Sequence, residues 1–459
     1  MCIFLPWYQA IGFSFFIVLV IVLHIFPRVW VYLSVFLFPM IGMKYPNVYL
    51  NMRGFDRSDA IPLMLLLAVI PFPFLIINVL TKPSRDIIKN PIFLPVFLLV
   101  SYSISTLFWS PAGMGFKLLY LFHLIIDIIL FYYLFYFIDD VKLHRRLMWC
   151  MVFSGLVISV QTMVEFGYVV QNLAFIQEDL IIKALNVFSI QVLSQSNLNE
   201  LNASGFFLGP QISSIMLDIV VFTAVGLLLT ENNKARRWFL RIAILMCITA
   251  VFLTGNKAGS WSLVMVLFLF VIFSIKLRKN MIRNLLATLA IFVSIFLTMA
   301  LVIRSQGSKD PRIVNVSTAQ QSSIGKRIYF WKTGFMELDK KRLTLFGLGV
   351  GGYKYFTRAY MIPHAHNIYL SLFFDFGVMG LIVCCIIMFI LLKLFLKVLS
   401  RQETYLQNMS LAYGISLVLI ALTGLVYTTY YMDFVWFVLG LAVATFRLAG
   451  KELPVENNL

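Results

Sequence analysis

One short segment of the chain holds the residues best suited to acid–base chemistry. Residues 363–370 read PHAHNIYL, and the sequence continues into DFG at 375–377. Imidazole exchanges a proton near neutral pH, so His366 is the candidate general base. A lone histidine at an aqueous interface more often has no chemical role, but a second histidine and an asparagine beside it favour a site. The candidate supporting residues are His364, Asn367 and Asp375.

Two segments upstream combine cations, glycines and aromatic residues. Residues 325–331 read GKRIYFW, and Arg327 and Trp331, four residues apart, share one face of a helix. The run FGLGVGG at 346–352 permits a tight turn and close approach of the backbone. It is not a Walker loop, because no Gly-Lys-Ser/Thr follows it.

A third segment, LTGNKAGSW at 253–261, places Lys257 between two apolar runs. An ionisable residue at such a place is a functional candidate. The alternative is a lysine that marks the end of a helix, with its ammonium in the interface. The sequence leaves both interpretations open.

The composition indicates the environment of these segments. Of the 459 residues, 61% are hydrophobic and 12% are charged, whereas a soluble domain has roughly a quarter of its residues charged. Apolar runs of about 20 residues recur along the chain, long enough to cross a bilayer as helices, and they lack the alternation of barrel strands. We expect an all-α polytopic integral membrane protein with about 12 transmembrane helices. The five cysteines show no metal or disulfide spacing, and we expect no metal and no cofactor.

Positive charge sets the expected orientation. Clusters of Lys and Arg fall in alternate short loops, which places them all in the cytoplasm. The net charge of +17 is then explained without nucleic acid as a partner. The clusters lie at 82–89, 142–146, 234–241, 276–283 and 393–401. The candidate spans are 5–26, 29–43, 60–80, 92–109, 117–138, 147–169, 210–230, 237–254, 257–277, 284–304, 367–392, 409–430 and 434–448, and a kink at Pro27 could merge the first two.

This orientation places the three chemical segments on the outer face. Residues 1–304 hold the first spans and an outer segment near 170–209, and residues 367–459 hold the last spans and a cytoplasmic tail. The large loop 305–366, in which we expect short helices, is basic although it lies outside. Its cations suit either anionic headgroups or a diphosphate, which arginine binds through its planar fork. Arg304, Arg312 and Lys326 are the candidate supporting cations.

The order of these motifs resembles the bacterial O-antigen ligase and polysaccharide polymerase family. Thr-Gly-Asn-Lys-Ala-Gly precedes Arg-x-x-x-Trp, Gly-x-Gly-x-Gly and His-Asn-x-Tyr-Leu, within residues 200–380. The resemblance implies a metal-independent, inverting glycosyltransferase of the bacterial inner membrane, with a periplasmic active face and an undecaprenyl-diphosphate-linked oligosaccharide as donor. By position, it implies that His366 activates the acceptor hydroxyl and that Lys257 and Arg327 hold the diphosphate.

The chain departs from the family pattern at two places. Lys257 stands where the family usually has an arginine, which keeps the charge but loses the bidentate fork. A further arginine is expected shortly before Ser204, yet residues 199–203 read NELNA. A simple transfer of the family's phosphate-binding residues therefore fails at one position.

Three functions remain open from the sequence. We expect a polymerase that extends a lipid-linked repeat unit among membrane lipids, with a chain-length regulator as a further partner. The alternative within the family is a ligase that transfers the glycan to lipid A core. The alternative of another class is a transporter or flippase for lipid-linked sugars, but no internal repeat supports it. Its candidate relay acids are Asp127, Glu165 and Asp218.

Overall fold

The computed structural model describes residues 27–38, 91–171, 210–256, 259–265, 267–268, 323–357, 365–399, 405–425 and 433–451. Every regular element in these residues is helical. The elements are α2 (Pro27–Leu37), α6 (Phe93–Ser105), η3 (Thr106–Phe108), α7 (Met114–Phe137), α8 (Val141–Gln171), α11 (Pro210–Thr230), α12 (Lys234–Leu253), α15 (Ser323–Lys340), α16 (Gly352–Thr357), α17 (Ile368–Leu399), α18 (Tyr405–Thr423) and α19 (Asp433–Lys451).

Five of the described helices are long and apolar enough to cross a bilayer. Each coincides with a span expected from the sequence, apart from shifts at the ends. These segments are Met114–Phe137, Val141–Phe166, Gln211–Thr230, Ile368–Val398 and Tyr405–Thr423. The helical membrane fold is therefore supported, while the total of about 12 spans and the periplasmic side of the large loop stay predictions.

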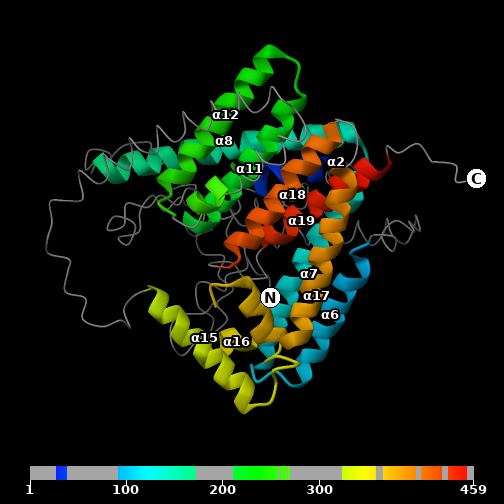
Figure 1. Ribbon diagram of the computed structural model, residues 1–459, viewed down its shortest axis with the longest axis vertical. Helices are drawn as coiled ribbons and strands as arrows, with labels where there is room; N and C mark the ends of the chain where they lie inside the picture. Colours follow the sequence, from blue (N-terminus) through cyan, green and yellow to red (C-terminus); the bar gives the residue numbers. More distant parts are fainter. Residues whose placement is uncertain are drawn as a thin grey trace, which may run out of the picture.

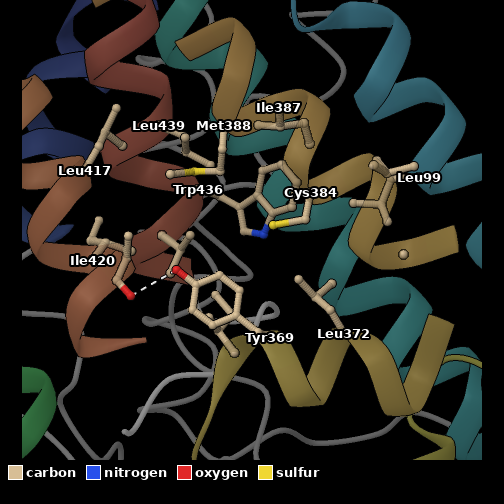
Figure 2. A pocket seen from close by; sticks show the side chains of 15 residues that line it. Leu99, Tyr369, Leu372, Cys384, Ile387, Met388, Leu417, Ile420, Trp436 and Leu439 are labelled. Atoms are coloured by element: carbon tan, nitrogen blue, oxygen red, sulfur yellow. Dashed lines mark hydrogen bonds between the residues drawn. The ribbon is translucent and has the colours of Figure 1, made fainter. Parts of the chain in front are cut away.

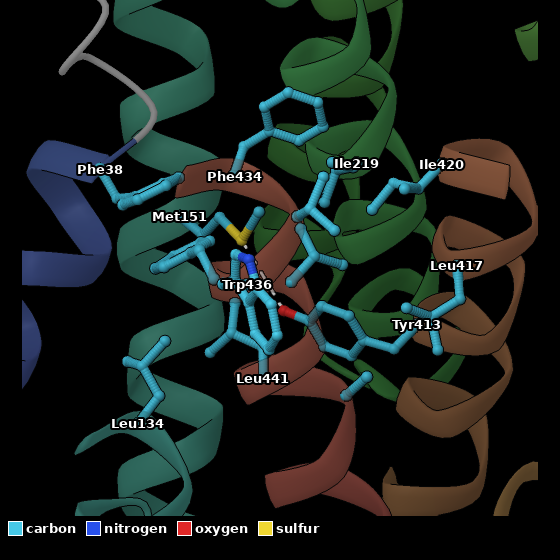
Figure 3. Close-up of a cluster of buried hydrophobic side chains, with 14 of the residues drawn as sticks. Phe38, Leu134, Met151, Ile219, Tyr413, Leu417, Ile420, Phe434, Trp436 and Leu441 are labelled. Carbon is cyan, nitrogen blue, oxygen red and sulfur yellow. Dashed lines mark hydrogen bonds between the residues drawn. The ribbon is translucent and has the colours of Figure 1, made fainter. Parts of the chain in front are cut away.

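Helix α11 lies at the centre of one group of helices and packs against α8, α12 and α18 (Figure 1). Its residues from Ser213 to Ala224 are buried on all sides, as expected of a mainly apolar helix that has no distinct polar face. Helix α19 packs against α18 of this group and against α7, and so connects the group to α7. The shared core holds Phe38, Leu134, Met151, Ile219, Tyr413 and Trp436 (Figure 3).

Polar contacts gather where the loops predicted to be cytoplasmic meet. Arg145 approaches the Glu231 carboxylate at 3.0 Å and Arg236 approaches it at 3.8 Å. Burial alone would raise the pKa of Glu231, but the hydrogen bond from the backbone of Asn233 and the charges of both arginines outweigh it and lower that pKa. Two of the basic clusters expected on one side of the membrane therefore do lie at one end of the bundle.

Helices α15 and α16 lie at the opposite end of the molecule from α12, close to the ends of α6, α7 and α17 (Figure 1). They lie within residues 305–366, so the segment predicted to be a large loop contains helices in its described part, α15 with 18 residues and α16 with six. This end of the molecule carries the predicted site.

Candidate functional site

His366 lies in the turn directly before α17. Its backbone is left-handed, with φ of 49°, a conformation in which Asn, Asp and His are the enriched non-glycine residues. The side chain is half-buried and its Nδ1 atom is buried. Such a conformation persists only where the surroundings hold it, so the contacts of the neighbouring residues decide how His366 is presented.

Trp331 of α15 holds one side of this turn. Its indole N–H donates to the carbonyl oxygen of Ala365 at 2.7 Å. Ala365 is buried in a small separate core, against which Trp331 packs. The remaining buried members of that core are Leu338, Leu348, Tyr353 and Phe374. The helix that carries Arg327 is thus fixed to the residue before His366.

The end of α18 holds the other side. The last carbonyl groups of a helix have no partner within it, and three residues of α17 and its N-terminal turn supply donors. Asn367 Nδ2 donates to Leu425 O at 2.8 Å, and the backbone N–H of Ile368 donates to Gly424 O at 2.7 Å. Tyr369 Oη donates to Ala421 O at 3.0 Å. The His-Asn-x-Tyr motif therefore attaches two helices to each other around His366.

Asn367 also caps α17, since its Oδ1 accepts the backbone N–H of Leu370 at 2.9 Å. Asp375, the other supporting residue in this motif, is buried and accepts the backbone N–H of Tyr353 at 2.9 Å. Burial, reinforced by this carboxylate, raises the pKa of Tyr353 above its ordinary value. Through these contacts Asn367 and Asp375 hold the helices that surround His366 in place.

The glycine loop (residues 343–351) closes a break in α17. At Gly377 the helix has φ of 63° and ψ of −157°, which leaves backbone groups unpaired within the helix. The loop supplies their partners: Leu348 N–H donates to Phe374 O at 2.8 Å, and Val378 N–H donates to Thr344 O at 3.2 Å. Non-helical backbone at membrane depth is tolerated where protein satisfies it in this way.

Three residues that the sequence analysis did not single out anchor the other side of the glycine loop. Tyr102 Oη donates to Phe346 O at 2.7 Å, and Trp109 Nε1 donates to Gly347 O at 3.2 Å. Thr106 Oγ1 accepts the backbone N–H of Val350 at 3.0 Å. The available signal was the pair of aromatic residues at the end of a span, where Tyr and Trp are enriched.

The described residues do not cover all the predicted cations. Arg327 and Lys326 lie in α15, but their side chains fall outside the described part. Lys257, Arg304, Arg312 and His364 lie outside it altogether. Asn256, next to Lys257 in the chain, donates from Nδ2 to Ser214 Oγ at 2.6 Å. The segment before Lys257 is therefore attached near the start of α11.

Two buried lysines lie close to the glycine loop. Lys354 Nζ is 4.9 Å from the centroid of the Tyr120 ring, a cation–π contact. Lys117 Nζ donates to Leu107 O at 2.8 Å. Neither lysine was a candidate site residue, because Lys354 was only one of many cations in the loop 305–366 and Lys117 matches none of the motifs.

Residues 242–385 match the family model described as O-antigen ligase. The match covers about a third of the chain, and this segment is similar to the O-antigen ligase family. The matched segment runs from α12 into α17, so it contains Lys257, Arg327, the glycine loop and His366. No curated protein matches the chain. The match confirms the family resemblance, and with the apolar helices it indicates a membrane enzyme of ligase or polymerase type in lipopolysaccharide or polysaccharide biosynthesis.

Proposed function

We propose that the protein is a polysaccharide polymerase of the bacterial inner membrane. It transfers a glycan from an undecaprenyl-diphosphate donor to a hydroxyl of a lipid-linked repeat unit at the periplasmic face, with inversion and without a metal. The observation that supports it most is the hydrogen bond from Trp331 to Ala365. It joins the helix of Arg327 to the turn of His366 within the family domain.

In the proposed reaction, His366 accepts the proton of the acceptor hydroxyl. The hydroxyl oxygen attacks the anomeric carbon of the donor, and the bond from that carbon to the diphosphate oxygen breaks. The electron pair leaves with the diphosphate, so negative charge grows on the leaving group. Cations placed there stabilise the transition state, as donors do in an oxyanion hole.

Arg327 and Lys257 are the proposed diphosphate-binding residues. Position 327 is four residues before Trp331 in α15, so it shares the helix face that meets Ala365. Arg304, Arg312, Lys326 and His364 are proposed supporting residues. Compared with the arginine that is usual in the family, Lys257 keeps the positive charge but cannot bind phosphate oxygens through two parallel hydrogen bonds. Arg327 therefore contributes more to phosphate recognition than Lys257 does.

The ligase is the second candidate, because the family description names that activity. The two enzymes differ in the acceptor, and the site's proposed chemistry serves both. The departures at Lys257 and at 199–203 support an enzyme tuned to one particular glycan, and for this reason we place the polymerase first.

A reconstituted assay separates the candidates. Purified protein in liposomes receives a lipid-linked repeat unit, with or without a lipid A core acceptor. Chain extension without core is expected. Transfer that requires core would replace the polymerase by the ligase, and movement of the intact lipid across the bilayer without transfer would favour a transporter. A chain-length regulator, the further partner that we propose, is tested by adding the candidate partner and measuring product length.

A further inference from the structure

An apolar cavity of about 100 Å³ lies among α6, α17, α18 and α19, within the membrane-spanning part (Figure 2). Its walls include Leu99, Leu372, Cys384, Leu417 and Trp436, and the described residues that line it include no charged side chain. The hydrogen bond from Tyr369 to Ala421 lies in its wall. An apolar cavity of this order stays dry and accepts apolar groups.

The cavity begins directly below the His366 turn. Ile368 and Tyr369, the second and third residues after His366, belong to its wall. Its lining along α17 falls in two parts on either side of the break at Gly377, the first from Ile368 to Leu372 and the second from Gly380 to Met388.

The cavity lies beside an exposed apolar surface of α17. Met388 in its wall is 38% exposed, and its neighbours Ile386 and Phe389 are 41% and 68% exposed. These residues lie in a segment apolar enough to cross the membrane. A hydrocarbon chain can therefore reach the cavity sideways from the bilayer without passing a polar surface.

We propose that this cavity holds a segment of the polyprenyl chain of the lipid-linked substrate while its diphosphate lies near His366. This inference rests on the proposed function, which supplies a lipid with a diphosphate at the end of its chain. The small volume suits one short branched segment, and the rest of the chain stays in the bilayer. Met388 and Cys384 supply polarizable sulfur atoms that adapt to irregular apolar shapes. A transmembrane helix, about 10 Å wide, is too wide to enter.

The adjacent cysteines provide a matched pair of variants. Cys384 lines the cavity, whereas Cys385 is exposed on another face of α17. Cys384→Phe fills the cavity, and Cys385→Phe adds the same ring outside it. Leu417→Phe fills the cavity from α18 and covers the case in which Cys384→Phe fails to fold. Thermal unfolding of each purified variant reports on folding.

The probe is a polyprenyl diphosphate with a diazirine in its hydrocarbon chain and no sugar. It is photolysed with the full-length protein in liposomes, and labelled residues are mapped by mass spectrometry. We expect labelling of the α17 lining residues between Ile368 and Met388, at least several-fold weaker in Cys384→Phe or Leu417→Phe and unchanged in Cys385→Phe. Undecaprenyl diphosphate should compete, and inorganic diphosphate, which can occupy the headgroup site but not the cavity, should compete far more weakly.

Equal labelling in the wild type and in both folded cavity-filling variants would overturn the inference. A diazirine phospholipid that labels the same residues, and that undecaprenyl diphosphate does not displace, would overturn it as well, because the cavity would then hold bulk lipid. The labelling needs no glycan transfer. If the cavity is labelled but the protein transfers no glycan, the proposed function alone is contradicted. If the protein transfers glycan but the cavity is not labelled, the proposed binding of the polyprenyl chain in the cavity alone is contradicted.

Discussion

Trp331 and Ala365 are 34 residues apart in the chain, and a hydrogen bond of 2.7 Å joins the indole N–H of the first to the carbonyl oxygen of the second. The tryptophan of the Arg-x-x-x-Trp motif thus holds the residue that precedes His366. The Arg-x-x-x-Trp motif and the motif of His366, which are separate in the sequence, are therefore joined in the structure. Substitutions that remove a single donor or acceptor can test this connection.

Trp331→Phe removes the indole donor and keeps an aromatic ring. The turn of His366 is then less firmly held. Because a neutral hydrogen bond contributes about 1 kcal/mol, turnover should fall about fivefold. The KM for the donor should change little. Steady-state transfer kinetics measure both. Trp238→Phe, at an exposed tryptophan of α12, is the control and should behave as wild type. Equal kinetics for the two variants would contradict the positioning role.

His366→Asn separates chemistry from backbone conformation. Asn accepts a left-handed backbone such as the φ of 49° at this position, whereas Ala in that conformation costs about 1–2 kcal/mol. Both variants lose the general base, so transfer should fall by about 10²-fold or more. Thermal unfolding should be near wild type for Asn and lower for His366→Ala. Full activity in His366→Asn would exclude the catalytic role.

Asn367→Asp tests the attachment of α17 to α18. The carboxylate keeps an acceptor for the N–H of Leu370, but it places an oxygen where Nδ2 donates to Leu425 O. Two facing acceptors repel, so unfolding should require roughly 1–3 kcal/mol less free energy, with reduced transfer. Denaturant titration in detergent measures the loss. Unchanged stability would mean that the contact with Leu425 contributes nothing.

Gly347→Ala tests the closure of the break in α17. Gly347 has φ of 76°, and a Cβ there would lie 2.3 Å from Asp375 O. The glycine loop must then move away from α17, at a cost of about 1–3 kcal/mol, with lower thermal stability and lower transfer. Gly113→Ala is the control, because a Cβ there meets nothing within 4 Å. A Gly347→Ala variant as stable as Gly113→Ala would show that the loop adapts freely.

Asp218→Asn distinguishes a transferase from a transporter. Asp218 is fully buried in α11, and neither carboxylate oxygen has a hydrogen-bond partner in the described structure. Asn keeps the size and polarity but cannot carry a proton. A transferase should retain near wild-type activity, whereas a proton relay would lose transport. Loss of transfer in a correctly folded Asp218→Asn variant would argue against a purely structural Asp218.

The sequence by itself determined the class of structure. In the described part of the chain, the apolar runs long enough to cross a bilayer are helices, because a chain in hydrocarbon must satisfy its own backbone groups. The span expected at 210–230 coincides with α11, Pro210–Thr230. The motifs around Arg327, the glycines and His366 were also visible, since they depend on residue type and short spacing.

The tertiary structure decided what the motif residues do. Residues 367–392 read as one unbroken apolar span, yet α17 breaks at Gly377 because the glycine loop supplies the missing backbone partners. From the sequence, Asn367 was predicted to be a supporting residue of the site. Its hydrogen bond to Leu425, 58 residues away, attaches the start of α17 to the end of α18. Such contacts arise from packing between helices distant in the chain, which local hydrophobicity and spacing do not encode.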